Sequence, residues 1–380
     1  MTRLEAGWQI TSWPGLQTAN GHSYIGAVTA DDAIIVSWDG LTPSTTYDLG
    51  TEGEHTHNSA AILFVDGQAP VVAYSRHNVD SMLRIRIGSQ PIGDGFTLGS
   101  ETTVAMGAST TYARIHHHDG DLFVWTRLAG RSWGYIRSGN WGGSWDSPIT
   151  VFQGPTGSGT SHHLYMRSKV TDAGVMHVAF QRHQDSATQD ARYAQINLTT
   201  GAISTADGTV LGNLDDTGLP VSPSNMDLVA SPTGLCRVTD VAYDGRVAWW
   251  DEDTGTYYVS EWNGSSWDAT DVGTCAQMIH GPNPGGVFFL EDGSLMLVTN
   301  PGEGFPFQMW VDGVKWWESL VAPLMWPRSP DGGLVAVMEV YDGGVFDNWD
   351  MSPILLDGPI PDHYTSCEGR GVPQWARWHP

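Results

Sequence analysis

The chain has 380 residues, with 46 Gly, 21 Pro and 18 Trp but only 16% charged residues, a composition that excludes a helical bundle and a disordered chain. Its 42 acidic and 18 basic residues give a formal net charge of −24, which argues against nucleic acid and anionic membranes as partners because both would be repelled. No stretch reaches the roughly eighteen apolar residues of a membrane span, so we expect a soluble all-β protein.

Seven similar segments follow one another along the chain, each a pair of apolar or alternating runs joined by an acidic or Gly turn. Asp-Gly between alternating runs is the strongest short hairpin signal in a sequence. Weaker strands with a second turn follow several segments, as at 138–148 and 260–269, so each unit is predicted to be a four-stranded sheet. In chain order, the predicted hairpins are 23–38, 59–76, 112–127, 164–182, 236–250, 285–299 and 326–340.

The spacing of these turns is close to that of propeller blades, which repeat every roughly 40 to 50 residues. Seven such sheets close radially without exposed edges. We therefore predict a seven-bladed β-propeller that residues 1–380 form as one domain, with residues 7–13 as the outer strand of the seventh blade. Two stacked β-sandwiches are the structural alternative.

Propeller geometry predicts where side chains gather. In a blade, the residues just before the first strand and just after the second meet at one rim. This rule places His57 and Asn58 at the entry of the second hairpin and His77 and Asn78 at its exit. A lone His at a strand end is usually a solvated rim residue, but two His-Asn pairs at both ends of one hairpin favour a site.

The third and fourth hairpins are expected to add side chains to the same rim. Residues 55–183 hold ten of the 14 histidines, and residues 76–192 hold 11 of the 18 basic side chains. A local cationic patch on an acidic protein suits an anionic ligand, because clefts of one sign focus the field. The added residues are Tyr112, Arg114 and Arg127 of the third hairpin and His163, Tyr165, Arg167 and His183 of the fourth. Arg137 of the third blade is a further positive charge that is expected to favour an acidic glycan on blades two to four.

The run His116 to His118 looks like a metal-binding tract. Consecutive strand residues alternate between the two faces of a sheet, so these three side chains cannot all bind one ion. We expect the run to be part of a strand and its turn.

The segment HNSAAILFVDGQAPVVAYSRHN (57–78), followed by YARIHHHDGDLFVWTR (112–127) and AFQRH (179–183), resembles the BNR-repeat propellers that include the ulvan lyases. These enzymes cleave sulfated, uronate-containing algal glycans. The resemblance covers blades two to four well and the remainder mainly as repeat architecture. It implies that His57, His77, Tyr112 and Arg127 line a catalytic cleft. From their predicted position or their charge, we expect the substrate-binding residues to be Asn58, Asn78, Arg114, Arg137, Arg167 and His183.

The chemistry of β-elimination explains these residue types. The proton on carbon five of a uronate becomes acidic only when the neighbouring carboxylate is neutralised. Arg127 suits that role because its planar guanidinium binds a carboxylate in bidentate fashion, with Asn58 or Asn78 as further donors. His57 or Tyr112 then takes the proton while the other protonates the departing oxygen, and His77 orients or shares either role. The sequence does not say which of His57 and Tyr112 is the base.

No metal is required by this mechanism. A structural zinc is a separate expectation, because Cys275 and His280 stand five apart and Cys236 opens the adjacent blade. Buried, inert cysteines are the alternative reading of the same residues.

Two other functions stay open. A sialidase-type hydrolase shares the propeller, but Glu101 is the only Glu between residues 55 and 200, so paired glutamates are not available there. A non-catalytic carbohydrate-binding propeller would keep the Arg and Trp contacts without needing His57. For the lyase, the expected partner is an acidic polysaccharide, and the expected state is a monomer that is secreted or extracellular, although the N-terminus lacks a recognisable signal peptide.

Overall fold

The computed structural model describes eighteen segments of the chain. The segments are 16–19, 22–28, 32–39, 42–51, 60–77, 79–89, 96–154, 163–183, 189–215, 217–234, 236–251, 253–274, 286–289, 293–299, 307–319, 323–326, 334–341 and 349–356. Residues 7–13, the predicted closing strand, lie outside them.

Antiparallel sheets make up almost all of the described structure, and they follow one another in chain order. Two short helical turns occur among the described residues, η1 (Ala129–Arg131) and η2 (Pro223–Asn225). The first three sheets have four strands each. They are β1 (Leu16–Ala19), β2 (His22–Val28), β3 (Asp32–Asp39) and β4 (Thr42–Thr51); β5 (Ala61–Leu63), β6 (Val71–Ser75), β7 (Met82–Ile87) and β8 (Thr102–Ala105); and β9 (Thr110–His118), β10 (Asp121–Leu128), β11 (Trp133–Ser138) and β12 (Ile149–Phe152).

The fourth sheet is enlarged, and the last is short. The fourth contains β13 (His163–Val170), β14 (Val175–His183), β15 (Gln189–Asn197), β16 (Ala202–Ser204), β17 (Val210–Asn213) and β18 (Asp227–Ala230). The others are β19 (Cys236–Val241), β20 (Val247–Asp251), β21 (Thr256–Trp262) and β22 (Trp267–Thr274); β23 (Gly286–Phe289), β24 (Leu295–Thr299), β25 (Phe307–Val311) and β26 (Val314–Ser319); and β27 (Pro323–Trp326), β28 (Leu334–Tyr341) and β29 (Trp349–Leu356).

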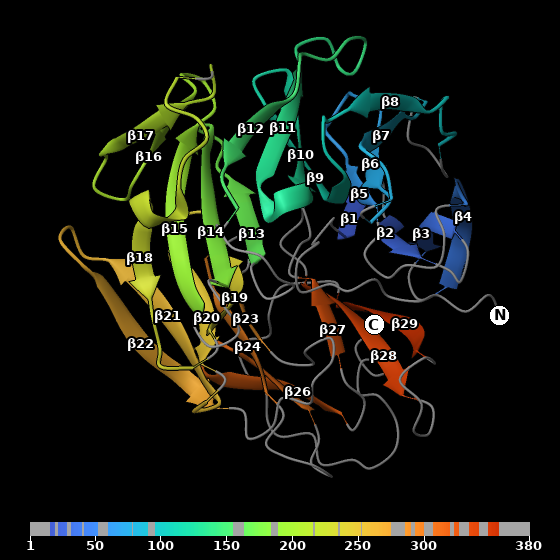
Figure 1. The fold of residues 1–380 in the computed structure, drawn as a ribbon. Helices are drawn as coiled ribbons and strands as arrows, with labels where there is room; N and C mark the ends of the chain where they lie inside the picture. The colour runs from blue at the N-terminus through green and yellow to red at the C-terminus, as the bar shows by residue number, and fades with distance from the viewer. Residues whose placement is uncertain are drawn as a thin grey trace.

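The sheets succeed one another around a common centre, as Figure 1 shows. The first strands of the second to sixth sheets, β5, β9, β13, β19 and β23, contact one another in turn. Apolar clusters fill the spaces between successive sheets, so that strands such as β6 are buried along their whole length. The core of this protein is therefore a series of layers between sheets, which fixes each sheet against its two neighbours.

The predicted hairpins correspond to strand pairs of the structure, with one difference. In the second to seventh sheets, the predicted hairpin is formed by the first two strands. In the first sheet, β1 precedes the hairpin, so residues 23–38 supply the second and third strands, β2 and β3. The alternating pattern identifies a strand pair but does not give its position in the sheet.

The hairpin turns of sheets two to four lie at one rim, as the sequence predicts. Asp119 and Gly120 both have positive φ, 48° and 85°, the geometry that favours Asp-Gly in a two-residue turn. Trp141 in this region donates its indole N–H to the carbonyl of Ala69 beside the preceding turn, 2.9 Å away. Gly174 of the following turn lies against the His118 ring. The opposite ends of the strands, where the candidate site is expected, therefore share the other rim.

The three consecutive histidines diverge, as strand alternation predicts. His116 is hydrogen-bonded to Ser168 Oγ at 2.9 Å, and His118 to Thr199 Oγ1 at 3.0 Å. The ring of His117 packs instead against Trp141, with centroids 5.3 Å apart. In the described part of the chain, no helix is long and apolar enough to cross a membrane.

Candidate functional site

The loop that follows β6 carries His77 to the exit rim of the second sheet. His77 Nδ1 is hydrogen-bonded to Thr111 Oγ1 of β9 at 2.7 Å, so the ring is oriented by the neighbouring sheet. The backbone N–H of Thr110 donates to the Asp80 carbonyl at 3.0 Å, which ties the end of the same loop to β9. His77 is thus held from both sides.

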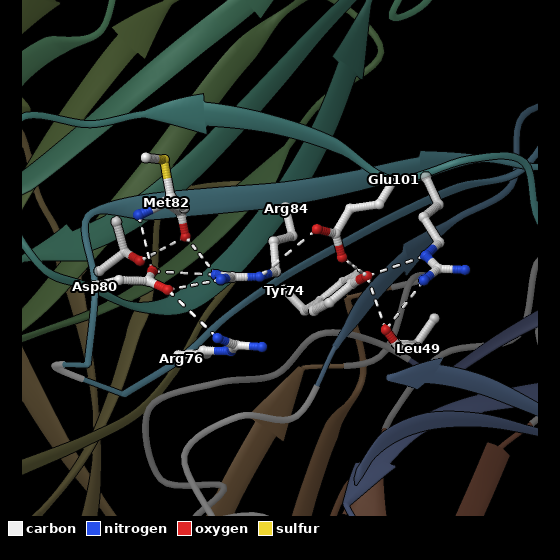
Figure 2. A network of polar contacts seen from close by, with 9 residues as sticks. Leu49, Tyr74, Arg76, Asp80, Met82, Arg84 and Glu101 are labelled. Carbon is white, nitrogen blue, oxygen red and sulfur yellow. Dashed lines mark hydrogen bonds and ion pairs between the residues drawn. The ribbon is translucent and has the colours of Figure 1, made fainter. Parts of the chain in front are cut away.

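Asp80 organises this loop through its carboxylate (Figure 2). It accepts two hydrogen bonds from the nearly buried Arg84, at 3.2 and 2.6 Å, and one from the Met82 N–H at 3.0 Å. Arg76, which precedes His77, lies 3.8 Å from the same carboxylate. The hydrogen bond from Arg84 is the main reason that the pKa of Asp80 is lowered, so this carboxylate stays charged at neutral pH.

A second part of the network in Figure 2 joins the first two sheets. The hydroxyl of Tyr74 donates to Glu101 at 2.6 Å and lies 3.0 Å from the Leu49 carbonyl, while Arg86 donates to the Tyr74 oxygen at 3.0 Å. Burial raises the pKa of Tyr74, which is therefore neutral. Glu101, the only Glu of this region, is thus engaged with Tyr74.

Tyr112 lies on a β-bulge in β9. Arg127 pairs with Thr111 and Trp125 pairs with Arg114, so two residues of β9 stand opposite Thr126 alone. Tyr112 adopts a φ of 58°, in the left-handed region, and the hydroxyl of Thr126 donates to the Thr111 carbonyl at 2.9 Å. Bulges of this kind redirect a side chain and are over-represented beside active sites.

The bulge brings Tyr112 under Arg127. The guanidinium carbon of Arg127 lies 4.5 Å from the centre of the Tyr112 ring and 5.1 Å from that of Tyr165, a cation–π arrangement with two rings. The two rings are 6.3 Å apart at 61°, and the His77 ring centre is 6.2 Å from that of Tyr112. His77, Tyr112, Arg127 and Tyr165 therefore form one cluster at the exit rim, which we call the rim cluster.

Charge in the rim cluster is not balanced locally. Arg127 is 5% exposed, and its buried Nη1 has no hydrogen-bond acceptor among the described residues. Arg131, four residues later, forms no ion pair with a described carboxylate, and its pKa is lowered first by burial and then by Arg127. A buried charge is normally paired because its desolvation is costly. The arrangement is therefore suited to receive an anion.

Arg114 and Arg167 point from the inner strands to neighbouring sheets. Arg114 donates from Nη2 to the Met166 carbonyl at 2.6 Å, and Arg167 donates from Nε to the Thr239 carbonyl at 3.0 Å. Both are about as buried as Arg127, and burial lowers the pKa of Arg114 to about 10. The structure thus places these two predicted binding residues beneath the rim, where they join blades.

Lys169 continues this line of inter-sheet contacts. Its Nζ donates to Asp240 Oδ2 at 2.7 Å and to the Phe289 carbonyl at 2.8 Å. Asp240 also accepts the Phe289 N–H at 2.9 Å. The fourth, fifth and sixth sheets are therefore joined near the centre by one ion pair.

Arg137 is not brought to the rim cluster. It stands opposite Phe123 in the register of β10 and β11, four residues from Arg127 along β10 and therefore about 13 Å away along the strand. It lies at the turn end of the sheet, exposed, and forms an ion pair with Asp121.

Five predicted site residues lie outside the described residues or are described only by their backbone. His57, Asn58 and Asn78 lie outside the described residues, so their roles stay predictions. The backbones of His163 and His183 pair at the ends of β13 and β14, at the rim where the sequence puts them.

The zinc prediction rests on one described residue. Cys236 is fully buried in the apolar cluster between the fourth and fifth sheets, and burial raises the pKa of its thiol. A raised thiol pKa disfavours the thiolate that zinc needs. Cys275 and His280 lie outside the described residues, and among the described ones no three His, Cys, Asp or Glu side chains form a group that could hold a metal ion.

The sequence placed Tyr165 at the rim, at the entry of the fourth hairpin, without a role in the site. Thr111 and Asp80 were not predicted, because they act through hydrogen bonds to the His77 loop and no local pattern distinguishes them.

Comparison with known proteins supports the fold. A search of curated protein sequences finds no match. Among solved structures, a polysaccharide lyase family 25 ulvan lyase bound to -[GlcA(1-4)Rha3S]- is similar with a TM-score of 0.63, at 14% identity over 93% of each chain. The polysaccharide lyase Uly1 has a TM-score of 0.57 at 14% identity over 90% of each chain.

Propellers of other activities are also similar. One is a putative 6-phosphogluconolactonase from Bacteroides fragilis, with a TM-score of 0.50 and 13% identity over 88% of this chain and 93% of that one. At such identities the similarity is one of fold alone. The family model of BNR repeat-containing family members matches residues 3–275. The resemblance expected from the His-Asn segment is confirmed, and the chain belongs to the BNR repeat-containing family.

Proposed function

We propose that the protein is a polysaccharide lyase that cleaves an acidic, uronate-containing and ulvan-like sulfated polysaccharide by β-elimination. The observation that carries the proposal is Arg127, a nearly buried guanidinium over two tyrosine rings, beside His77 and without a described carboxylate partner. The fold similarity to ulvan lyases supports the same reaction class.

In this mechanism, Arg127 binds the uronate carboxylate. The site around Arg127 is largely desolvated, which strengthens the interaction between the two charges. Neutralising the carboxylate acidifies the proton on carbon five. A base removes that proton. The electron pair of the broken carbon–hydrogen bond forms the double bond between carbons four and five, and the bond from carbon four to the leaving oxygen breaks. An acid then protonates that oxygen.

His77 and Tyr112 are the described side chains to which we assign proton transfer beside Arg127. The Thr111 hydrogen bond holds Nδ1 of His77, so the proton transfer uses Nε2. Tyr112 lies in the rim cluster with its ring under the Arg127 charge. His57, with Asn58 and Asn78 as donors, completes the proposed site, and His57 and Tyr112 share the base and acid roles.

We propose further that the sheets are blades of a closed, seven-bladed propeller formed by residues 1–380 as one domain. The order of the sheets around a centre and the contacts between successive first strands support this architecture. A structural zinc held by Cys236, Cys275 and His280 stays a separate prediction.

The proposed reaction is tested by incubating the protein with a panel of polyanionic glycans, ulvan included, and with neutral glycans. We expect ultraviolet absorbance from an unsaturated uronate on at least one uronate-containing glycan, and cleaved products that together contain no added water by mass spectrometry. Products that contain added water and no carbon–carbon double bond would indicate a hydrolase. Binding without cleavage of any uronate glycan would indicate a carbohydrate-binding propeller.

A further inference from the structure

The hydroxyl of Thr111 is buried and faces the ring of His77. Thr111 is 1% exposed, and its Oγ1 lies 2.7 Å from His77 Nδ1. Among the residues that the structure describes, this ring nitrogen is the one hydrogen-bond partner of the Thr111 hydroxyl. The contact can form in two ways: the hydroxyl donates its proton to Nδ1, or an Nδ1–H donates to the hydroxyl oxygen.

Burial distinguishes the two directions of this hydrogen bond. If Nδ1–H were the donor, the proton of the Thr111 hydroxyl would have no acceptor among the described residues. An unsatisfied buried donor is costly, and such groups are rare in folded proteins. If the hydroxyl is the donor, its proton and the Nδ1 lone pair satisfy each other. The structure therefore favours Thr111 as the donor.

Two other buried threonines beside the bulge of β9 donate their hydroxyl protons within the protein. The Thr110 hydroxyl lies 3.0 Å from the Met82 carbonyl, and the Thr126 hydroxyl lies 2.9 Å from the Thr111 carbonyl. A carbonyl oxygen can only accept, so both hydroxyls are donors. Thr110 and Thr126 are fully buried, as Thr111 nearly is. Donation by Thr111 gives the third hydroxyl the same satisfied state.

The direction of the hydrogen bond determines the tautomer of His77. A neutral imidazole carries one ring proton, and the nitrogen that accepts a hydrogen bond is the one without it. Because Nδ1 accepts from Thr111, the proton of the neutral ring is on Nε2. A protonated Nε2 can donate to an oxygen that carries negative charge, but it has no lone pair with which to take a proton from carbon. Neutral histidines act as electrophiles of this kind in enzymes.

We propose that Thr111 is a positioning residue that keeps the proton of neutral His77 on Nε2, so that His77 is a hydrogen-bond donor to the bound uronate and not the base. This inference rests on the proposed function, and within it narrows the role of His77 to donation at Nε2. The His77 ring centre lies 6.2 Å from that of Tyr112, which is under Arg127. The Nε2–H therefore adds to the Arg127 charge, and Tyr112 or His57 removes the proton on carbon five.

The tautomer is measured by NMR of the protein labelled with ¹⁵N-histidine, at a pH where the ring is neutral. The His77 signals are those that disappear in His77→Gln, which assigns them among the 14 histidines. We expect Nε2 to resonate as a protonated nitrogen and Nδ1 as an unprotonated one, in the wild type and in Thr111→Ser. Thr111→Val removes the hydroxyl and should move both signals toward those of mixed tautomers. A protonated Nδ1 in the wild type overturns the proposal.

Kinetics on the uronate glycan test the consequence for the reaction. Thr111→Val should lower kcat about tenfold, the effect of one misplaced hydrogen bond, with KM changed less than about twofold. Thr111→Ser should recover kcat to within about twofold, because it restores the hydroxyl. His77→Gln keeps an N–H donor but no base, so its kcat/KM should exceed that of His77→Leu about tenfold. Equal losses in these two His77 variants overturn the donor role.

The matched control is Thr239→Val, which deletes a threonine hydroxyl in the fifth sheet. That hydroxyl donates to the Val287 carbonyl at 2.8 Å, so the control also loses one hydrogen bond between neighbouring sheets. It should leave kcat within about twofold of wild type and the His77 signals in place. If Thr111→Val does not fold, the wild-type tautomer and the comparison of His77→Gln with His77→Leu still decide the proposal.

The outcomes separate this inference from the proposed function. Elimination by a protein whose neutral His77 carries its proton on Nδ1 overturns the role of Thr111 and leaves the lyase in place. A proton on Nε2 that depends on the Thr111 hydroxyl, in a protein that yields no unsaturated product from any uronate glycan, supports the role of Thr111 and overturns the lyase.

Discussion

The two ends of the third sheet carry arginines in opposite environments. At the turn end, Arg137 is exposed, paired with Asp121 and 5.9 Å from the Phe123 ring centre. At the exit end, Arg127 is buried over Tyr112 with no described acid beside it. Both arginines lie in or opposite the same strand, β10, so the residue type alone does not define the role. Of these two arginines, Arg127 is the one without an acid partner among the described residues, and this difference is why we propose that the exit end of the sheet binds the substrate.

Removing the Arg127 charge should have the largest effect. Arg127→Ala is expected to lower kcat/KM by about 10³-fold, since it deletes the group that neutralises the uronate carboxylate. Arg127→Lys should lose nearly as much, because an ammonium does not provide the planar fork. The melting temperature should change little. The variant loses the packing of the Arg127 side chain, but it also no longer buries a charge that has no acid partner among the described residues. A kcat/KM within tenfold of wild type in both variants would contradict a functional role for the exit end of the third sheet.

Removing the Tyr112 hydroxyl should have the next largest effect. Tyr112→Phe keeps the ring under Arg127 and the bulge but deletes the proton-transferring group, so kcat should fall about 100-fold with KM little changed. Tyr135→Phe is the matched control, since its hydroxyl donates to the Leu214 carbonyl away from the rim. That control should cost about 1 kcal/mol of unfolding free energy and keep its activity. Normal turnover by Tyr112→Phe would remove Tyr112 from the mechanism.

Neutralising Asp80 should loosen the His77 loop. The unfolding free energy of the variant should therefore differ from that of the wild type, by an amount that depends on pH. Because the folded pKa of Asp80 is lowered, its stabilising effect is present above the ordinary value of 3.8 and is lost as the pH falls through the lowered pKa. Asp80→Asn should therefore lower the unfolding free energy by about 1 kcal/mol at neutral pH, the upper end for a partly exposed ion pair.

The Asp80 measurement is an acid titration of unfolding by circular dichroism, with kinetics beside it. The curves of Asp80→Asn and the wild type should converge at low pH, and a constant gap would contradict the assignment. A raised KM or a displaced pH profile of kcat would identify Asp80 as a positioning residue for His77, a result that a purely structural role would not produce.

The smallest effect is expected at the turn end. Arg137→Ala breaks an exposed ion pair, which is worth at most about 1 kcal/mol, and leaves the rim cluster intact. Activity should stay within about twofold of wild type, measured on the same glycan as the Arg127 variants. A loss comparable with that of Arg127→Ala would show that both ends of the sheet contact the substrate.

The site was predictable in outline and not in detail. The entry and exit rule correctly brought His77, Tyr112 and Arg127 to one rim, because strand pairing is local and turns fix its register. It also put Arg114 and Arg167 there, although their guanidinium groups bind carbonyls 52 and 72 residues away on neighbouring sheets. Arg137 was predicted by charge alone, and charge carries no information about which end of a strand a side chain occupies.

The sequence by itself determined the all-β class, the hairpins, the turn chemistry of Asp119 and Gly120 and the divergence of His116 to His118, because these follow from a period of two and from backbone preferences of single residues. Tertiary structure decided the bulge at Tyr112, the Asp80 anchor of the His77 loop and the meeting of Arg127 with Tyr165. A bulge shifts the pairing by one residue, and contacts between sheets join segments that are distant in sequence. Neither leaves a periodic signal along the chain.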